Sequence, residues 1–336
     1  MGKTKKLMRG TPRHLDMLQP LGKSVCDYLL INISGKCNYR CKKCCNSSPN
    51  KEVKLALNDI KEILHEAKTE LGIRAVAIFG EGETLMAPHY KEIIKYIDKL
   101  GLLTVQFTNG YFLDRKMAEF LKAHNVSAIV SVDYLDGKRY DEFVGVKGAY
   151  KRAMKNISVA RKIFAKTIEK FNGYRLYRLG INTVVTVDNK GQLAKLKRFC
   201  GEDMMFICNY PIQKGFANVW KERIYRNDAE YGKLKQLALR ASENRGFSGI
   251  TDAEKCGYLF YGLSIGIDGN VQLCPYALET GGLLGNIKEA SLLELNRHVK
   301  KIINGFKYRD RCARCYLRFP AEYVEFLDYL KQNRYG

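Results

Sequence analysis

The sequence predicts an α/β protein: a partial (β/α)6 barrel of the TIM type, followed by a small C-terminal unit made of a β-hairpin and helices. Two observations lead to this prediction. Six short apolar runs alternate with helix-like segments through the first two thirds of the chain, which is typical of βαβ units and a parallel sheet. The pattern then changes, and cysteines recur at spacings used for metal ligation.

The six apolar runs are the predicted strands. Each is rich in β-branched or aromatic residues and is bounded by polar or glycine-containing segments. Six such units are too few to close a standard eight-stranded barrel, so the sequence favours an open or partial one. The predicted strands cover residues 27–34, 75–80, 103–108, 127–133, 180–187 and 203–209.

Helix-like segments lie between these strands. In the first of them Leu55, Leu57, Ile60, Leu64 and Leu71 fall close to one helical face, which is the 3.6-residue period of an amphipathic helix. The predicted helices cover residues 55–71, 87–100, 114–124, 148–169 and 190–200.

The last third of the chain predicts a smaller unit. A polar helical stretch leads to alternating runs around Asp268-Gly269, a strong hairpin signal, and further helices follow at 289–303 and 320–332. So thin a core needs a metal to stabilise it. We therefore divide the chain into a basic extension (1–25), a barrel (26–225) and the small unit (226–336).

Composition excludes several classes of protein. Hydrophobic residues make up 46% of the 336 and charged residues 27%, which is the balance of a globular chain. No apolar run approaches the roughly 18 residues that span a membrane, and the basic N-terminus lacks a signal-peptide core. We expect a cytoplasmic protein with no membrane partner.

The net charge of +22 is concentrated in three segments, 1–25, 151–178 and 297–318. Such clustering can mark an anionic partner, RNA included, although solvated surface lysines account for it equally well.

Eleven cysteines in a chain expected in the cytoplasm point to metal ligation rather than disulfides. Cys37, Cys41 and Cys44 follow directly after the first predicted strand. Three thiolates at this spacing suit three irons of a [4Fe–4S] cluster and leave the fourth iron open to a ligand. The adjacent Cys45 breaks the spacing, and we treat it as a bystander.

The C-x3-C-x2-C spacing after the first strand resembles the signature of the radical SAM superfamily. Gly80-Glu81-Gly82-Glu83 ends the second strand, where the family has a Gly-Gly-Glu-Pro-like motif that receives the amino group of S-adenosylmethionine (SAM). Thr108-Asn109-Gly110 ends the third strand and Ser131-Val132-Asp133 ends the fourth, as in many members. The resemblance extends over about residues 27–215 and implies SAM contacts by Gly80, Gly82, Glu83, Thr108, Asn109, Ser131, Asp133 and Asn182.

Two positions depart from the family pattern. Lys43 stands where the family usually has an aromatic residue near the adenine, so Tyr39 is expected to serve instead, and Thr84 replaces the usual proline. An alternative interpretation is a zinc site that pairs Cys41 and Cys44 with a second cysteine pair, Cys312 and Cys315.

A second cysteine set follows the barrel. Its order of Cys, Asp-Gly hairpin, Cys-Pro and C-x2-C resembles the SPASM/twitch extensions of radical SAM enzymes, and the absence of cysteine after the last of them favours the shorter twitch form. The resemblance implies a second, saturated [4Fe–4S] cluster, with structural zinc as the alternative. The four cysteines are Cys256, Cys274, Cys312 and Cys315.

Three cysteines remain. Cys26 and Cys200 are predicted to be buried thiols, which behave as small apolar groups. Cys208, at the end of the sixth strand, has two interpretations: packing in the core, or donation of a hydrogen atom to a substrate radical.

The resemblance implies an enzyme that reductively cleaves SAM to a 5′-deoxyadenosyl radical and abstracts hydrogen from a small anionic molecule or a peptide. The outcome would be an oxidation or an epimerisation, with flavodoxin or ferredoxin as reductant. The alternatives are a radical SAM enzyme acting on RNA and a non-catalytic zinc or iron–sulfur protein.

Overall fold

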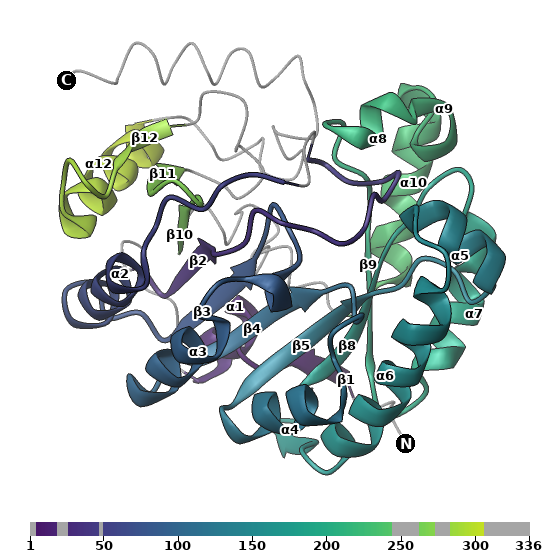
Figure 1. Cartoon of the computed structure of the whole chain (residues 1–336), viewed down its shortest axis with the longest axis horizontal. Helices are drawn as coiled ribbons and strands as arrows, with labels where there is room; N and C mark the ends of the chain where they lie inside the picture. Colours follow the sequence, from purple (N-terminus) through teal and green to yellow (C-terminus); the bar gives the residue numbers. More distant parts are fainter. Residues whose placement is uncertain (1–4, 19–25, 47–49, 244–261, 273–282, 306–336) are drawn as a thin grey trace.

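A computed structural model of the chain describes residues 5–18, 26–46, 50–243, 262–272 and 283–305. Its main feature is a sheet in the order β12-β11-β10-β2-β3-β4-β5-β8-β9 (Figure 1). Seven strands run parallel to one another: β10, β2, β3, β4, β5, β8 and β9. The strand β11 pairs antiparallel with both β10 and β12. All six predicted strands are present. The bounds are β2 Tyr28–Asn32, β3 Ala75–Phe79, β4 Leu103–Thr108, β5 Val126–Ser131, β8 Leu179–Val184, β9 Met205–Asn209, β10 Gly262–Ile265, β11 Asn270–Gln272 and β12 Leu283–Asn286.

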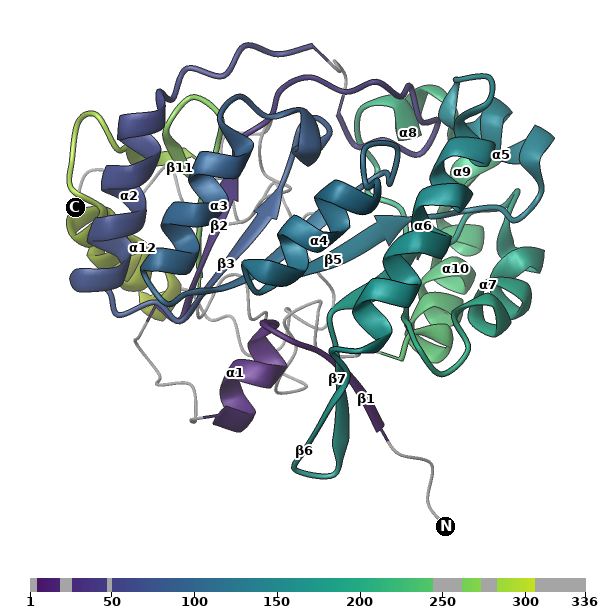
Figure 2. The same cartoon turned by 60° about the horizontal axis from the view of Figure 1, so that its bottom comes forward.

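Helices cover one face of this sheet (Figures 1 and 2). They include the five predicted ones and an additional helix, α5, which begins where the Asp136 side chain accepts a hydrogen bond from the Arg139 amide. It ends at Gly145 in the left-handed region. The helices are α2 Leu57–Thr69, α3 Tyr90–Lys99, α4 Arg115–Ala123, α5 Gly137–Val144, α6 Ala149–Ala165, α7 Leu193–Cys200, α8 Phe216–Val219, α9 Lys221–Ile224, α10 Asp228–Ala241 and α12 Leu292–Gly305, with short 3₁₀ turns η1 Thr84–Met86 and η2 Lys190–Gln192.

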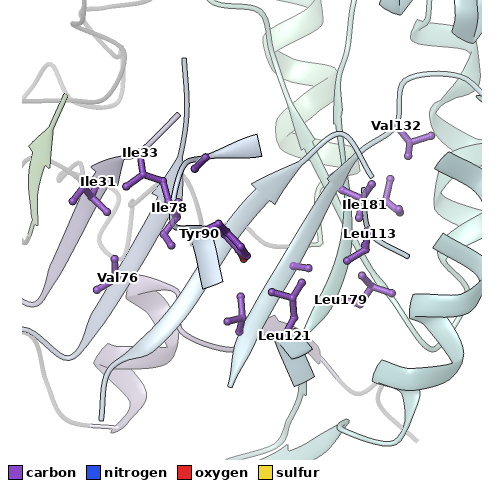
Figure 3. Close-up of a cluster of buried hydrophobic side chains, with 14 of the residues drawn as sticks. Ile31, Ile33, Val76, Ile78, Tyr90, Leu113, Leu121, Val132, Leu179 and Ile181 are labelled. Atoms are coloured by element: carbon purple, nitrogen blue, oxygen red, sulfur yellow. The ribbon is translucent and has the colours of Figure 1, made fainter. Parts of the chain in front are cut away.

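Alternation along the strands separates two cores. Ile31, Ile78 and Ile181 belong to the large core between sheet and helices, part of which Figure 3 shows. Leu30, which precedes Ile31, and Ile207 of β9 have the opposite orientation and belong to a smaller core on the concave face. The sheet is therefore curved, with helices outside and a concave side within.

The N-terminal segment is folded against the end of this concave side. β1 (Lys5–Met8) pairs with β7 (Tyr174–Tyr177), which pairs with β6 (Glu169–Phe171), and α1 (Pro12–Leu18) lies beside them (Figure 2). Met8 and Leu15 are fully buried in the concave core. Residues 5–18 thus close one end of the barrel and form more than a basic extension, because their apolar side chains find partners remote in the sequence.

The C-terminal hairpin is continuous with the barrel. The predicted turn is confirmed, with Gly269 at φ +84°, and β10 pairs in parallel with β2. On the opposite edge, α10 packs on β9, and Glu243 exchanges hydrogen bonds with Phe206. The sheet therefore extends across the domain boundary placed at residue 225. Among the described residues, no helix is both long and apolar enough to cross a membrane.

Candidate functional site

The cysteine loop, residues 35–46, leaves the C-terminal end of β2. Its backbone is fixed against α5, because the Arg40 amide donates to the Val144 carbonyl at 2.8 Å and the Lys42 amide donates to Phe143 at 3.0 Å. A further bond, from the Cys44 amide to the Cys41 carbonyl at 3.0 Å, closes a turn between two of the cysteines. The loop is therefore held at the end of the strands where parallel α/β barrels carry their chemistry.

Cys37 and Cys41 pack against the large core between sheet and helices. Burial raises the pKa of Cys37 to about 11 and that of Cys41 well above its usual range, and neighbouring thiols contribute in the same direction. The Tyr39 amide donates to the Cys37 sulfur at 3.4 Å. Such thiols ionise when a metal replaces the proton, and an N–H donor to sulfur suits iron–sulfur ligation.

No group of three His, Cys, Asp or Glu side chains in the described part of the chain converges as ligands to one ion. A [4Fe–4S] cluster makes no such demand, since each thiolate binds a different iron. Cys37, Cys41 and Cys44 fit such a cluster by residue type and by their common loop.

The GEGE segment, residues 80–83, follows β3 and meets the end of β4. The Glu83 carboxylate is 3% exposed and accepts hydrogen bonds from the Thr108 hydroxyl at 2.5 Å and the amides of Asn109 (2.7 Å) and Leu85 (3.2 Å). Burial raises the pKa of Glu83, and these three bonds oppose the shift. The carboxylate therefore ties together three predicted SAM contacts.

The GEGE segment is also bonded to the cysteine loop. The Glu83 amide donates to the Lys36 carbonyl at 2.7 Å, and the Asn109 side chain donates to Asn38 at 2.8 Å. A Cβ at Gly82 would lie 2.2 Å from the Lys36 carbonyl oxygen, so only glycine fits there. Sequence reasoning missed Asn38, whose one signal is its position within the cysteine motif.

Asp133, an expected SAM contact, is also held by internal bonds. Its carboxylate is 3% exposed and lies 2.6 Å from the Lys43 ammonium, and it also accepts from the Val184 amide (3.0 Å) and the Thr183 hydroxyl (3.2 Å). These internal bonds occupy both oxygens. Lys43, in the family's aromatic position, thus anchors the cysteine loop to β5 and β8.

Tyr39 does not replace that aromatic residue. Its side chain is 2% exposed and lies in the helix-side core, with its ring perpendicular to that of Tyr111 at 6.1 Å. The expectation that it packs on adenine is therefore not supported, because Tyr39 faces the core beneath the loop.

Polar residues do line the concave side at the ends of the later strands. Ser131 pairs in register with Asn182. The side-chain oxygen of Asn182 accepts a hydrogen bond from the side-chain nitrogen Nδ2 of Asn209 at 2.7 Å. Ser131, Asn182 and Asn209 therefore lie on neighbouring strands on the concave side.

Cys208 lies on the other face of β9. It is 4% exposed in the helix-side core, and burial raises its pKa to about 12. Packing in the core therefore describes Cys208, and a hydrogen donor to the concave side does not. Cys26 and Cys200 are buried, as predicted. Cys256, Cys274, Cys312 and Cys315, with the zinc alternatives that use them, lie outside the described residues.

Two family models match the chain. That of the radical SAM superfamily matches residues 31–174, and that of an iron–sulfur cluster-binding domain named SPASM matches residues 256–316. The first range contains the cysteine loop and the GEGE segment, and the second contains the later cysteine set. The first domain implies a [4Fe–4S] cluster and SAM, and the second implies auxiliary iron–sulfur ligation.

Curated relatives match over part of their length. AdoMet-dependent heme synthase of Methanosarcina barkeri is 31% identical over 133 residues, which are 39% of this chain and 38% of that protein. GTP 3′,8-cyclase of Haemophilus influenzae is 34% identical over 124 residues, 35% of this chain and 36% of that protein. The match spans less than two fifths of either relative.

Solved structures match over most of the chain. SuiB of Streptococcus suis bound to precursor peptide SuiA gives a TM-score of 0.60 at 20% identity, covering 88% of this chain and 67% of that one. Native anSMEcpe with bound AdoMet gives 0.62 at 18% identity, covering 91% and 97%. These similarities confirm the predicted fold class.

Proposed function

We propose that this chain, which belongs to the radical SAM superfamily and carries an iron–sulfur cluster-binding domain, removes a hydrogen atom from a peptide or a small anionic molecule. When bound, the cluster and SAM supply the chemistry: one electron from a flavodoxin- or ferredoxin-type donor breaks the C5′–S bond, which gives methionine and a 5′-deoxyadenosyl radical that takes the hydrogen. The substrate radical then leads to product.

The observation that carries this proposal is the joining of the cysteine loop to the GEGE segment. Bonds from Glu83 to Lys36 and from Asn109 to Asn38 set both motifs at one end of the sheet. A carboxylate has about four acceptor positions, and protein donors fill three at Glu83. The remaining one suits the amino group of SAM.

Oxidation is the outcome that we favour over epimerisation. Epimerisation needs a second hydrogen donor facing the substrate, and Cys208 lies in the helix-side core instead. An oxidation needs an acceptor for one further electron, which an iron–sulfur centre held within residues 256–316 would supply. The cysteines within residues 256–316 would then hold a twitch-type electron acceptor.

The proposal predicts distinct effects for two changes at the site. Glu83→Ala should retain iron and lose about 10- to 150-fold in SAM affinity, because one charge-assisted hydrogen bond is worth about 1.5–3 kcal/mol. Joint replacement of Cys37, Cys41 and Cys44 by alanine should remove that cluster and abolish 5′-deoxyadenosine formation. Iron analysis, anaerobic calorimetry with SAM and product chromatography measure these effects.

Glu83→Gln is the matched control for size, since it keeps the side-chain shape and one acceptor oxygen. Unchanged SAM affinity in Glu83→Ala would contradict the assignment of the GEGE segment. Stoichiometric zinc without labile sulfide in the wild-type protein would contradict the proposed function as a whole.

A further inference from the structure

The segments that enter and leave the cysteine loop are tied together at its base. Lys36 and Asn50 form an isolated antiparallel bridge, and the Lys51 amide donates to the Gly35 carbonyl at 2.8 Å. This approach needs a glycine, since a Cβ at Gly35 would lie 2.0 Å from the Lys51 carbonyl oxygen. Residues 50–54, which we term the return segment, therefore have a fixed position beside the start of the loop.

An ion pair joins the return segment to the GEGE segment. The Lys51 ammonium lies 2.6 Å from Oε2 of Glu81, and the two side chains are 28% and 5% exposed. Apart from this ammonium, the buried oxygen has no partner among the residues that the structure describes, so Lys51 compensates its charge. The Asn46 side chain also donates to the Glu81 carbonyl at 3.3 Å. Glu81 is thus held at its carboxylate and at its backbone by residues that follow the three cysteines.

The ion pair acts on the backbone of the expected SAM contacts. Glu81 immediately precedes Gly82, which is packed tightly against the backbone of Lys36, and Glu83, whose amide donates to the Lys36 carbonyl. Three consecutive residues are therefore fixed to the entering and returning sides of one loop. A displacement of Glu81 would move its two successors, because each residue has only two soft backbone dihedral angles.

The exposure of the two partners favours a role in positioning over a role in stability. An ion pair with a partly exposed lysine adds little to the stability of a fold. Loss of Lys51, however, leaves the Glu81 carboxylate buried without its cation, which is costly. Movement of this carboxylate toward water would strain the GEGE backbone to which it belongs. The main effect is therefore expected at the SAM site.

We propose that Lys51 and Glu81 are positioning residues for SAM, because their ion pair holds the GEGE backbone in the arrangement to which SAM binds. This inference rests on the proposed function. It adds the return segment to a site otherwise built from the cysteine loop and the strand ends.

The test measures SAM affinity by anaerobic calorimetry on the full chain with its clusters reconstituted. Lys51→Met and Glu81→Gln should each weaken SAM binding about 10- to 100-fold, the range found for residues that orient metal ligands. The double variant should bind SAM no more weakly than the poorer of the two single variants, since both changes break one interaction. Lys51→Arg keeps a cation that pairs with a carboxylate, so it should restore most of the affinity.

Asp203→Asn is the matched control for Glu81→Gln. It removes a carboxylate from another ion pair, with Arg161 at 2.7 Å, but Asp203 precedes β9 and so lies at the opposite end of the strands from the GEGE segment. This variant should leave SAM affinity unchanged. Iron content and Tm, measured for every variant, report separately on the clusters and on the fold.

Loss of SAM affinity at wild-type iron content supports the proposal. It is overturned if Lys51→Met and Glu81→Gln bind SAM as the wild type does, if their losses add in the double variant, or if iron is lost together with SAM affinity. It is also overturned if Lys51→Arg binds SAM as weakly as Lys51→Met. Failure of the wild-type protein itself to bind SAM would instead contradict the proposed function.

Discussion

At the scale of residues, Lys43 shows how one substitution of a family pattern is accommodated. The side chains of Lys43 and Asp133 are 10% and 3% exposed, and the pair joins the cysteine loop to the end of β5 across 90 residues of sequence. A buried ion pair adds little net stability over an apolar pair, but removing one partner leaves a buried charge without compensation. Lys43 and Asp133 therefore depend on each other.

Lys43→Met and Asp133→Asn should each lower the free energy of unfolding by about 3–5 kcal/mol, whereas the double variant should lose clearly less than the sum. Urea unfolding under anaerobic conditions measures this double-mutant cycle. Arg115→Ala is the control, since its pair with Glu119 at 3.5 Å is exposed on α4 and should contribute less than about 1 kcal/mol. Additive losses would show that the pair is not coupled.

At the scale of elements, the start of α8, with Gly215 before it, also supports the cysteine loop. The amides of Phe216 and Ala217 donate to the carbonyls of Asn46 at 3.2 Å and Cys44 at 2.9 Å. Gly215 makes this approach possible: its φ is +56°, and a Cβ there would lie 2.5 Å from Asn46 backbone atoms. Two elements distant in the sequence therefore determine the position of the third cysteine.

Gly215→Ala should displace the cysteine loop, because both the left-handed backbone and the contact with Asn46 exclude a side chain. We expect a lower iron and sulfide content after reconstitution. The visible absorbance of the cluster, which comes from charge-transfer bands, should be weaker as well. Gly191→Ala is the matched control, since no atom lies within 4 Å of its Cβ position. Equal iron content in the two variants would contradict the supporting role of Gly215.

At the scale of the whole molecule, segments from both ends of the chain complete the barrel. β10 extends the sheet beyond β2, and α1 with β1 closes the opposite end of the concave side (Figure 2). His14 of α1 is 3% exposed, and its Nδ1 accepts from the Gly10 amide at 3.1 Å. Burial, with the positive charges of Arg9 and Arg74, lowers the pKa of His14 to about 4.

This pKa makes the closed end sensitive to acid. In the unfolded chain His14 takes up a proton below the ordinary histidine pKa of 6.5, whereas folded His14 does so only near 4, so stability falls as the pH drops between these values. His14 should account for a loss of about 2 kcal/mol between pH 7.5 and pH 5. His14→Gln should reduce that loss in urea unfolding, whereas His65→Gln, on the exposed face of α2, should not. An identical pH dependence in both variants would contradict this account.

The repeating architecture and the chemistry-bearing loops were predictable from local sequence patterns. Strands such as 103–108 and helices such as 55–71 were predictable because their apolar periodicity is local. The cysteine spacing and the GEGE segment were likewise readable, because each is a contiguous motif at a strand end. The turn at Asp268-Gly269 belongs to the same class, since its backbone conformation favours those residues.

The face of the sheet on which a residue lies, and the partner that it contacts, depend on how distant segments pack together. The side of β9 on which Cys208 lies follows from the sheet register, and a shift of one residue would have reversed it. The bond of Lys43 to Asp133 and the pairing of β10 with β2 join segments distant in the sequence. Local patterns do not encode such contacts, because their energy comes from burying side chains together after the chain has folded.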